Sequence, residues 1–187
     1  MRSDIVFTLT GPDRVGIVEE VTGVLLGLDG NVETSRMTRL GGEFAILMLV
    51  TLPAERLPEL GPALDHLIAA GYKVTTSGTQ RDRAREHEGW LPYRIEIQGA
   101  DHEGIIHEIA AGLSGRGINI ESMETATSQA PISATPLFSM TALVAVPTEL
   151  DEPDWEAELA EAAHLANVDI TVSAVERGQD PSHDSRG

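Results

Sequence analysis

The sequence predicts an α+β protein built from two copies of one small unit, each with a four-stranded antiparallel sheet and two helices on one face. Three observations predict this fold class. A stretch near the N-terminus recurs 88 residues further on, apolar residues follow strand and helix periods in the same order in both copies, and turn residues separate these stretches.

The repeat runs without gaps through the first part of each copy. Nine residues recur at a spacing of 88: Gly11/Gly99, Asp13/Asp101, Gly16/Gly104, Ile17/Ile105, Glu20/Glu108, Leu25/Leu113, Gly27/Gly115, Asn31/Asn119 and Glu33/Glu121. The spacing becomes 94 from Phe44/Phe138 onward, which places an insertion around Ser128–Pro136. We predict homologous domains at 1–79 and 92–176, a charged linker at 80–91 and a disordered tail at 177–187.

The first copy opens with a strand and a helix. Apolar and polar residues alternate over Asp4–Thr10, which is typical of a strand. Apolar residues at helical spacing follow over Ile17–Leu28. We expect Asp13 to provide the N-cap of this helix and Gly30 to end it.

Two strands, a helix and a last strand complete the first copy. The strands Asn31–Leu40 and Glu43–Leu52 flank Gly41-Gly42, a tight hairpin signal. An amphipathic helix over Leu57–Ile68 is closed by Gly71, and Tyr72–Gly78 is the last strand.

The second copy repeats this order. Its elements are predicted at 93–98 (strand), 103–116 (helix), 119–128 and 138–146 (strands), 154–166 (helix) and 168–175 (strand). The βαββαβ order in each copy indicates a ferredoxin-like arrangement. The stretch Phe44–Val50 is apolar at every position, so we expect that strand to be buried on both faces and the domains to pair, within or between chains.

Composition and charge exclude several classes of function. The 187 residues carry a net charge of −17, which disfavours direct binding of nucleic acid. No apolar run reaches membrane-spanning length, no secretion signal is evident and there is no cysteine, all consistent with a soluble cytoplasmic protein.

Catalytic and metal-binding motifs are absent from the sequence. The stretch His102–His107 places its histidines five residues apart, whereas two ligands on one helix face need a spacing of four. Gly112–Gly117 fails the nucleophile pattern G-x-S-x-G because Arg116 takes the last glycine position. We therefore expect no enzyme activity, no metal and no cofactor.

The motifs GPDRVGIV with GNVE, and GADHEGII with GINIE, resemble the ACT domain, a small regulatory module that binds amino acids. The tandem layout, with TPLFSMTALVAVP and WEAELAEAAHLANVDITV in the second copy, resembles the glycine cleavage system transcriptional repressor family. The resemblance implies that the protein senses glycine or serine, acts on a transcriptional activator by protein contact, and forms a homodimer. Val15 and Glu103 stand where ACT loops often carry proline, and Glu103 adds a negative charge where a carboxylate would dock.

The repeated glycines suggest where the ligand binds. Helix N-termini attract anions, and glycine at Gly16 leaves room for a carboxylate, flanked by Asp13 and Arg14. In ACT domains this loop meets the asparagine-bearing segment of a paired domain, so the resemblance adds Asn31. The predicted ligand-binding residues are Asp13, Arg14, Val15, Gly16, Ile17, Asn31 and Val32, with Asp101, Gly104, Ile105, Asn119 and Ile120 in the second copy.

Plainer interpretations of the same residues stay open. The glycines could only let helix and strand pack closely, Asp13 could be only an N-cap, and Asn31 only a turn residue. Two other functions also remain: a ligand-free oligomerisation module, and an acylphosphatase-like hydrolase in which Arg14 and Asn31 hold phosphate.

Overall fold

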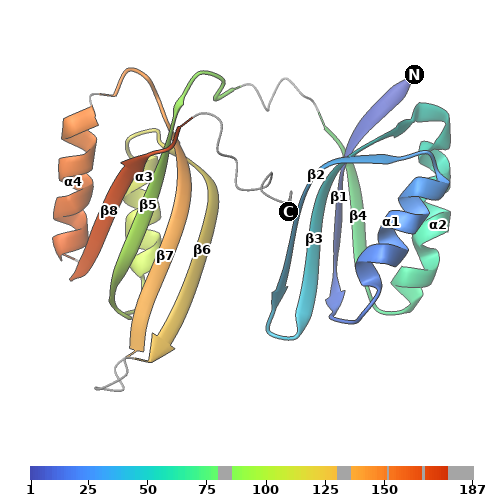
Figure 1. The fold of residues 1–187 in the computed structure, drawn as a ribbon, viewed down its shortest axis with the longest axis horizontal. Coiled ribbons are helices and arrows are strands. Elements are labelled where there is room, and N and C mark those ends of the chain that lie inside the picture. The colour runs from blue at the N-terminus through green and yellow to red at the C-terminus, as the bar shows by residue number, and fades with distance from the viewer. Residues whose placement is uncertain (80–85, 130–135, 151, 166, 177–187) are drawn as a thin grey trace, which may run out of the picture. The chain divides into compact units, whose positions relative to one another are not determined.

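The chain divides into two compact units, Met1–Ala84 and Arg85–Gly187, in the computed structural model (Figure 1). The structure describes residues 1–79, 86–129, 136–150, 152–165 and 167–176. The predicted tail, residues 80–85 of the predicted linker and residues 130–135 of the predicted insertion lie outside the described residues.

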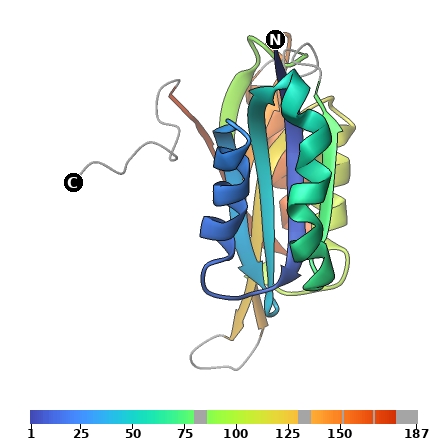
Figure 2. The same cartoon turned by 90° about the vertical axis from the view of Figure 1, so that its right-hand side faces the viewer.

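The first unit contains one sheet and two helices in the predicted order. Its elements are β1 (Arg2–Pro12), α1 (Ile17–Gly27), β2 (Asn31–Leu40), β3 (Glu43–Pro53), a 3-10 turn (Ala54–Arg56), α2 (Leu57–Ala69) and β4 (Lys73–Gly78). The strands pair antiparallel in the order β2-β3-β1-β4. Figures 1 and 2 show α1 and α2 side by side on one face of this sheet.

The second unit repeats the architecture. Its elements are β5 (Leu91–Ala100), α3 (Ile105–Ser114), β6 (Asn119–Gln129), β7 (Pro136–Val146), α4 (Glu152–Leu165) and β8 (Val168–Ala174). Their antiparallel order, β6-β7-β5-β8, matches that of the first sheet. The prediction of two ferredoxin-like domains is confirmed.

Each unit has its own apolar core between sheet and helices. The first core combines inward-facing residues of β1 and β3, such as Phe7 and Met48, with Leu25 of α1 and Leu64 of α2. The second core is built in the same way and adds Trp155, whose ring meets Tyr93 edge-on at a centroid distance of 5.3 Å. Among the described residues, no polar or charged residue is buried in either core.

Within the first unit, strand β3 is buried on one face only; burial of its other face depends on the predicted pairing of domains and stays a prediction. Ile46, Met48 and Val50 face the helices and are buried, whereas Leu47 on the opposite face is 47% exposed. On the outer face, Leu47 is exposed, whereas Ala45 and Leu49 are half-buried.

Helix α1 ends differently from the prediction. The left-handed residue after it is Asp29, with φ 55°, and not Gly30. The Gly30 N–H bonds to the Leu25 carbonyl at 2.8 Å and the Asp29 N–H to the Leu26 carbonyl at 3.0 Å, the two bonds of a Schellman motif. Gly117, with φ 72°, takes the same place after α3.

None of the helices in the described parts of the chain has the length and apolar content needed to cross a membrane.

Candidate functional site

The entrance of α1 is set by the backbone of Gly16. This residue is the N-cap, with φ 89° and ψ −4°, and no side chain caps the helix. Gly104 does the same for α3, with φ 93°. A Cβ on Gly16 would meet no atom within 4 Å, so close packing does not explain the glycine. The left-handed conformation explains it, because side chains other than glycine disfavour positive φ.

Asp13 ties the entrance loop to the β2–β3 hairpin and is not the predicted N-cap. Its N–H donates to the Gly42 carbonyl at 3.0 Å. Its carboxylate accepts from Nε of Arg39 at 2.7 Å. These contacts fix the loop beside the hairpin tip, where Val15 and Leu40 are almost fully exposed.

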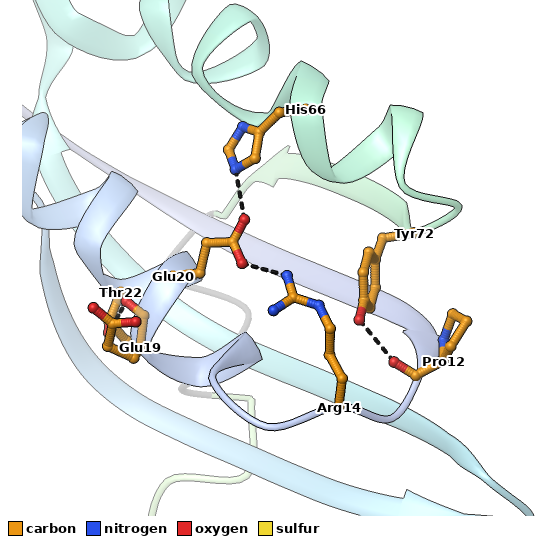
Figure 3. Close-up of polar contacts among 7 residues, drawn as sticks. All are labelled: Pro12, Arg14, Glu19, Glu20, Thr22, His66 and Tyr72. Carbon is orange, nitrogen blue, oxygen red and sulfur yellow. Dashed lines mark hydrogen bonds and ion pairs between the residues drawn. The ribbon is translucent and has the colours of Figure 1, made fainter.

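Arg14 belongs to a polar cluster that joins the loop to both helices (Figure 3). Its guanidinium pairs with Glu20 Oε2, and Glu20 Oε1 lies 3.0 Å from His66 Nε2 on α2. The guanidinium also lies over the Tyr72 ring, 5.6 Å from the centroid. The Tyr72 hydroxyl donates to the Pro12 carbonyl at 2.7 Å, so the cluster holds both ends of the turn between β1 and the entrance.

The cluster shifts the pKa values of its ion pair in opposite directions. The hydrogen bond from Arg14 lowers the pKa of Glu20, and the contact with His66 lowers it further. The hydrogen bond to Glu20 raises the pKa of Arg14. Both side chains are therefore charged over the physiological pH range.

An open hollow of about 590 Å³ lies at the entrance of α1. Its lining consists of Asp13, Arg14, Gly16, Ile17, Val18, Glu19, Thr22 and Phe44. The Thr22 hydroxyl is already engaged, since it donates to the Val18 carbonyl at 2.8 Å. The sequence analysis missed four of these residues: Val18, Glu19, Thr22 and Phe44. The helical spacing of Gly16, Glu19 and Thr22 is the signal that could have found two of them.

Asn31 and Val32 do not lie near the hollow of their own unit. Asn31 begins β2 and pairs with Thr51, whereas the entrance lies at the end of the sheet where Leu40 pairs with Glu43. Nine residues of strand separate the two ends, about 30 Å. The predicted set therefore falls into two groups within the unit, and Arg14 cannot hold a phosphate together with the unit's own Asn31.

The second entrance keeps the backbone of the first but not its cluster. The Asp101 N–H donates to the Pro136 carbonyl at 3.0 Å, as Asp13 does to Gly42. His102 replaces Arg14, and its Nδ1 lies 3.2 Å from the Glu103 carbonyl. Ile105 follows Gly104 as the first helical residue, whereas Asn119 and Ile120 begin β6 at the far end of the sheet.

The chemistry that this arrangement offers is binding by charge and by backbone amides. The first turn of α1 presents N–H groups and a partial positive charge, with a guanidinium and two carboxylates nearby. No group of three or more metal-ligating side chains occurs among the residues that the structure describes.

The fold and the repeated glycine entrance define a tandem ferredoxin-like protein. Residues 3–71 match the ACT domain family, and the first unit belongs to this family. The chain is similar to the glycine cleavage system transcriptional repressor of Escherichia coli, with 30% identity over 133 residues, 67% of this chain and 66% of the relative. It thus aligns with about two thirds of the length of that curated relative.

Solved structures agree with the tandem fold. A protein of unknown function from Galdieria sulphuraria is 32% identical, with a TM-score of 0.80 over 94% of this chain and 99% of its own. A candidate glycine cleavage system transcriptional repressor is 19% identical, with a TM-score of 0.69 over 94% of this chain and 98% of its own, which shows the fold alone. The resemblance inferred from the sequence motifs is confirmed.

Proposed function

We propose that the protein is a regulator that senses a small amino acid, with glycine or serine as the candidates, and that it is not an enzyme. The observation that carries the proposal is the uncapped entrance of α1, which opens on a hollow in the unit that matches the ACT family. The similarity to a transcriptional repressor of the glycine cleavage system supports the choice of ligand.

The ligand is proposed to bind by its two charged ends. Its carboxylate would accept hydrogen bonds from the first-turn N–H groups and attract Arg14. Its ammonium would pair with Glu19, which lines the hollow and forms no ion pair with another described residue. A second copy of the chain, in the homodimer that we propose, would bring the segment with Asn31 and Val32 to this entrance, as happens in paired ACT domains.

The output is proposed to be a protein contact, such as one that restrains a transcriptional activator in the cytoplasm. A net charge of −17 favours a protein partner over DNA, since binding to DNA depends on neutralising phosphates. The ligand would favour one arrangement of paired domains, to the extent that its affinities for the two arrangements differ.

Calorimetry with glycine and L-serine tests the sensing function. A hundredfold excess of ligand over its Kd should raise the stability of the binding unit by about 2.7 kcal/mol, seen as a higher melting temperature. Glycinamide, which keeps the ammonium but lacks the carboxylate, is the control and should have a much smaller effect. Unchanged melting temperatures with every amino acid tested would contradict the proposal.

A ligand-free assembly module is the second candidate. It is favoured by the exposed aliphatic side chains of the first unit, Val15, Leu40 and Leu47. In that case size-exclusion chromatography would give the same oligomer with and without amino acids, and Leu47→Asp would dissociate it.

A further inference from the structure

We propose that Glu20 limits the affinity of the first entrance by holding Arg14, and that the carboxylate of the amino acid displaces Glu20 from Arg14 when it binds. The inference rests on the proposed function and deepens it, since it assigns a regulatory residue that does not touch the ligand.

Glu20 does not line the hollow, and it engages the guanidinium of Arg14, which does. In Figure 3, Glu19 and Thr22 lie on one side of the first turn of α1, and Glu20, His66 and the Arg14 guanidinium lie on the other. Glu19 and Thr22 line the hollow, whereas Glu20 and His66 do not. Arg14 borders the hollow while its guanidinium is engaged by Glu20 and by the Tyr72 ring.

His66 makes the exchange feasible. It contacts the other oxygen of Glu20 at 3.0 Å, so Glu20 keeps a partner after it has lost Arg14. Both side chains of the Arg14–Glu20 pair are partly exposed, at 41% and 32%, and water can hydrate the groups that the exchange leaves free. The competition is therefore between the Glu20 carboxylate and the ligand carboxylate for one guanidinium.

The second unit provides a matched control. Glu108 stands at the position of Glu20, but His102 replaces Arg14. Val168 replaces Tyr72: it contacts the Cβ position of Gly99, as Tyr72 contacts that of Gly11. Glu108 thus occupies the same position in α3 as Glu20 in α1, but the second unit has no arginine at the position of Arg14.

The size of the effect follows from the strength of the pair. A ligand that needs Arg14 released from Glu20 binds only those molecules in which the pair is open. Its apparent affinity is reduced in proportion to the fraction of such molecules. Partly exposed ion pairs have small coupling energies, so removing Glu20 should tighten binding by about two- to fivefold.

Isothermal titration calorimetry of the full chain with glycine and L-serine tests the proposal. Glu20→Gln should lower Kd by about two- to fivefold, and Glu108→Gln should leave it unchanged. The same Glu20→Gln change in an Arg14→Gln background should have no effect, which separates competition for Arg14 from a general reduction of negative charge. Glycinamide should bind Glu20→Gln no better than the original protein, because it lacks the competing carboxylate.

The outcomes are distinguishable. Equal or weaker amino-acid binding by Glu20→Gln overturns the inference while the sensing function stands. An equal gain with and without Arg14, or with glycinamide, also overturns it, because the effect would then come from charge alone. No binding of either amino acid by any variant overturns the proposed function and the inference with it. A melting curve of each variant verifies that it is folded.

Discussion

Gly16 and Gly104 hold φ angles of 89° and 93°, which other residues adopt only at a cost of about 1–2 kcal/mol. The repeated glycine is therefore a requirement of the backbone at the start of each helix. It does not by itself identify a ligand, because both units keep it although only the first has Arg14 and its partners.

Gly16→Ala should lower the free energy of unfolding by about 1–2 kcal/mol through backbone strain, since its Cβ would meet nothing. Gly23→Ala is the matched control: it lies on the exposed side of α1, its Cβ also meets nothing, and its φ is not positive. Gly23→Ala should raise stability by about 0.4–1 kcal/mol. Urea unfolding measures the stability of both variants. Equal changes in the free energy of unfolding would contradict the conclusion that positive φ requires glycine at position 16.

The pair between Glu20 and Arg14 should make stability depend on pH in acid. The folded state lowers the pKa of Glu20, so the unfolded state binds more protons once the pH approaches the ordinary glutamate pKa. The contribution is present above that value, near 4.5, and is lost as the pH falls through the lower folded pKa. Arg14→Gln should flatten the pH profile of the melting temperature below pH 5, with Arg116→Gln as the control.

The elements themselves follow from local patterns that a single sequence contains. Apolar spacing, together with hairpin and turn signals, predicted all eight strands and four helices of the described chain. The helix ends were less predictable. Asp13 has a side chain suited to capping α1, but its carboxylate instead pairs with Arg39 of β2. Local sequence does not reveal such a tertiary contact.

Two glycines control how closely the strands approach the segments that follow the second helices. A Cβ on Gly11 would lie 2.5 Å from the buried Tyr72 ring, and one on Gly99 would lie 2.9 Å from the Val168 Cα. Gly11→Ala should cost about 1–3 kcal/mol by overpacking. Gly99→Ala should lower the free energy of unfolding at least as much, because the added Cβ would meet the backbone of Val168, which cannot rotate away as a side chain can. Gly78→Ala, where a Cβ meets nothing, should differ little from the original in thermal unfolding; a loss equal to that of Gly11→Ala would refute the packing argument.

At the scale of the whole molecule, the repeat predicted the fold of both units but could not predict how they differ in chemistry. Residues 1–84 carry 8 basic and 11 acidic side chains, and residues 85–187 carry 5 and 19, giving net charges of −3 and −14. An anionic group approaching the first entrance therefore meets far less repulsion than one approaching the second. The Arg14 cluster was out of reach of sequence analysis because its members come from the loop, α1, α2 and the residue before β4.

The position of Trp155 in the core of the second unit has a practical consequence for spectroscopy. The only two tryptophans, Trp90 and Trp155, both belong to the second unit. Intrinsic indole emission therefore reports melting of that unit and is blind to the half of the chain with the arginine-bearing hollow. A screen that relies on this emission would miss a ligand that stabilises only the first unit, whereas backbone dichroism would register it.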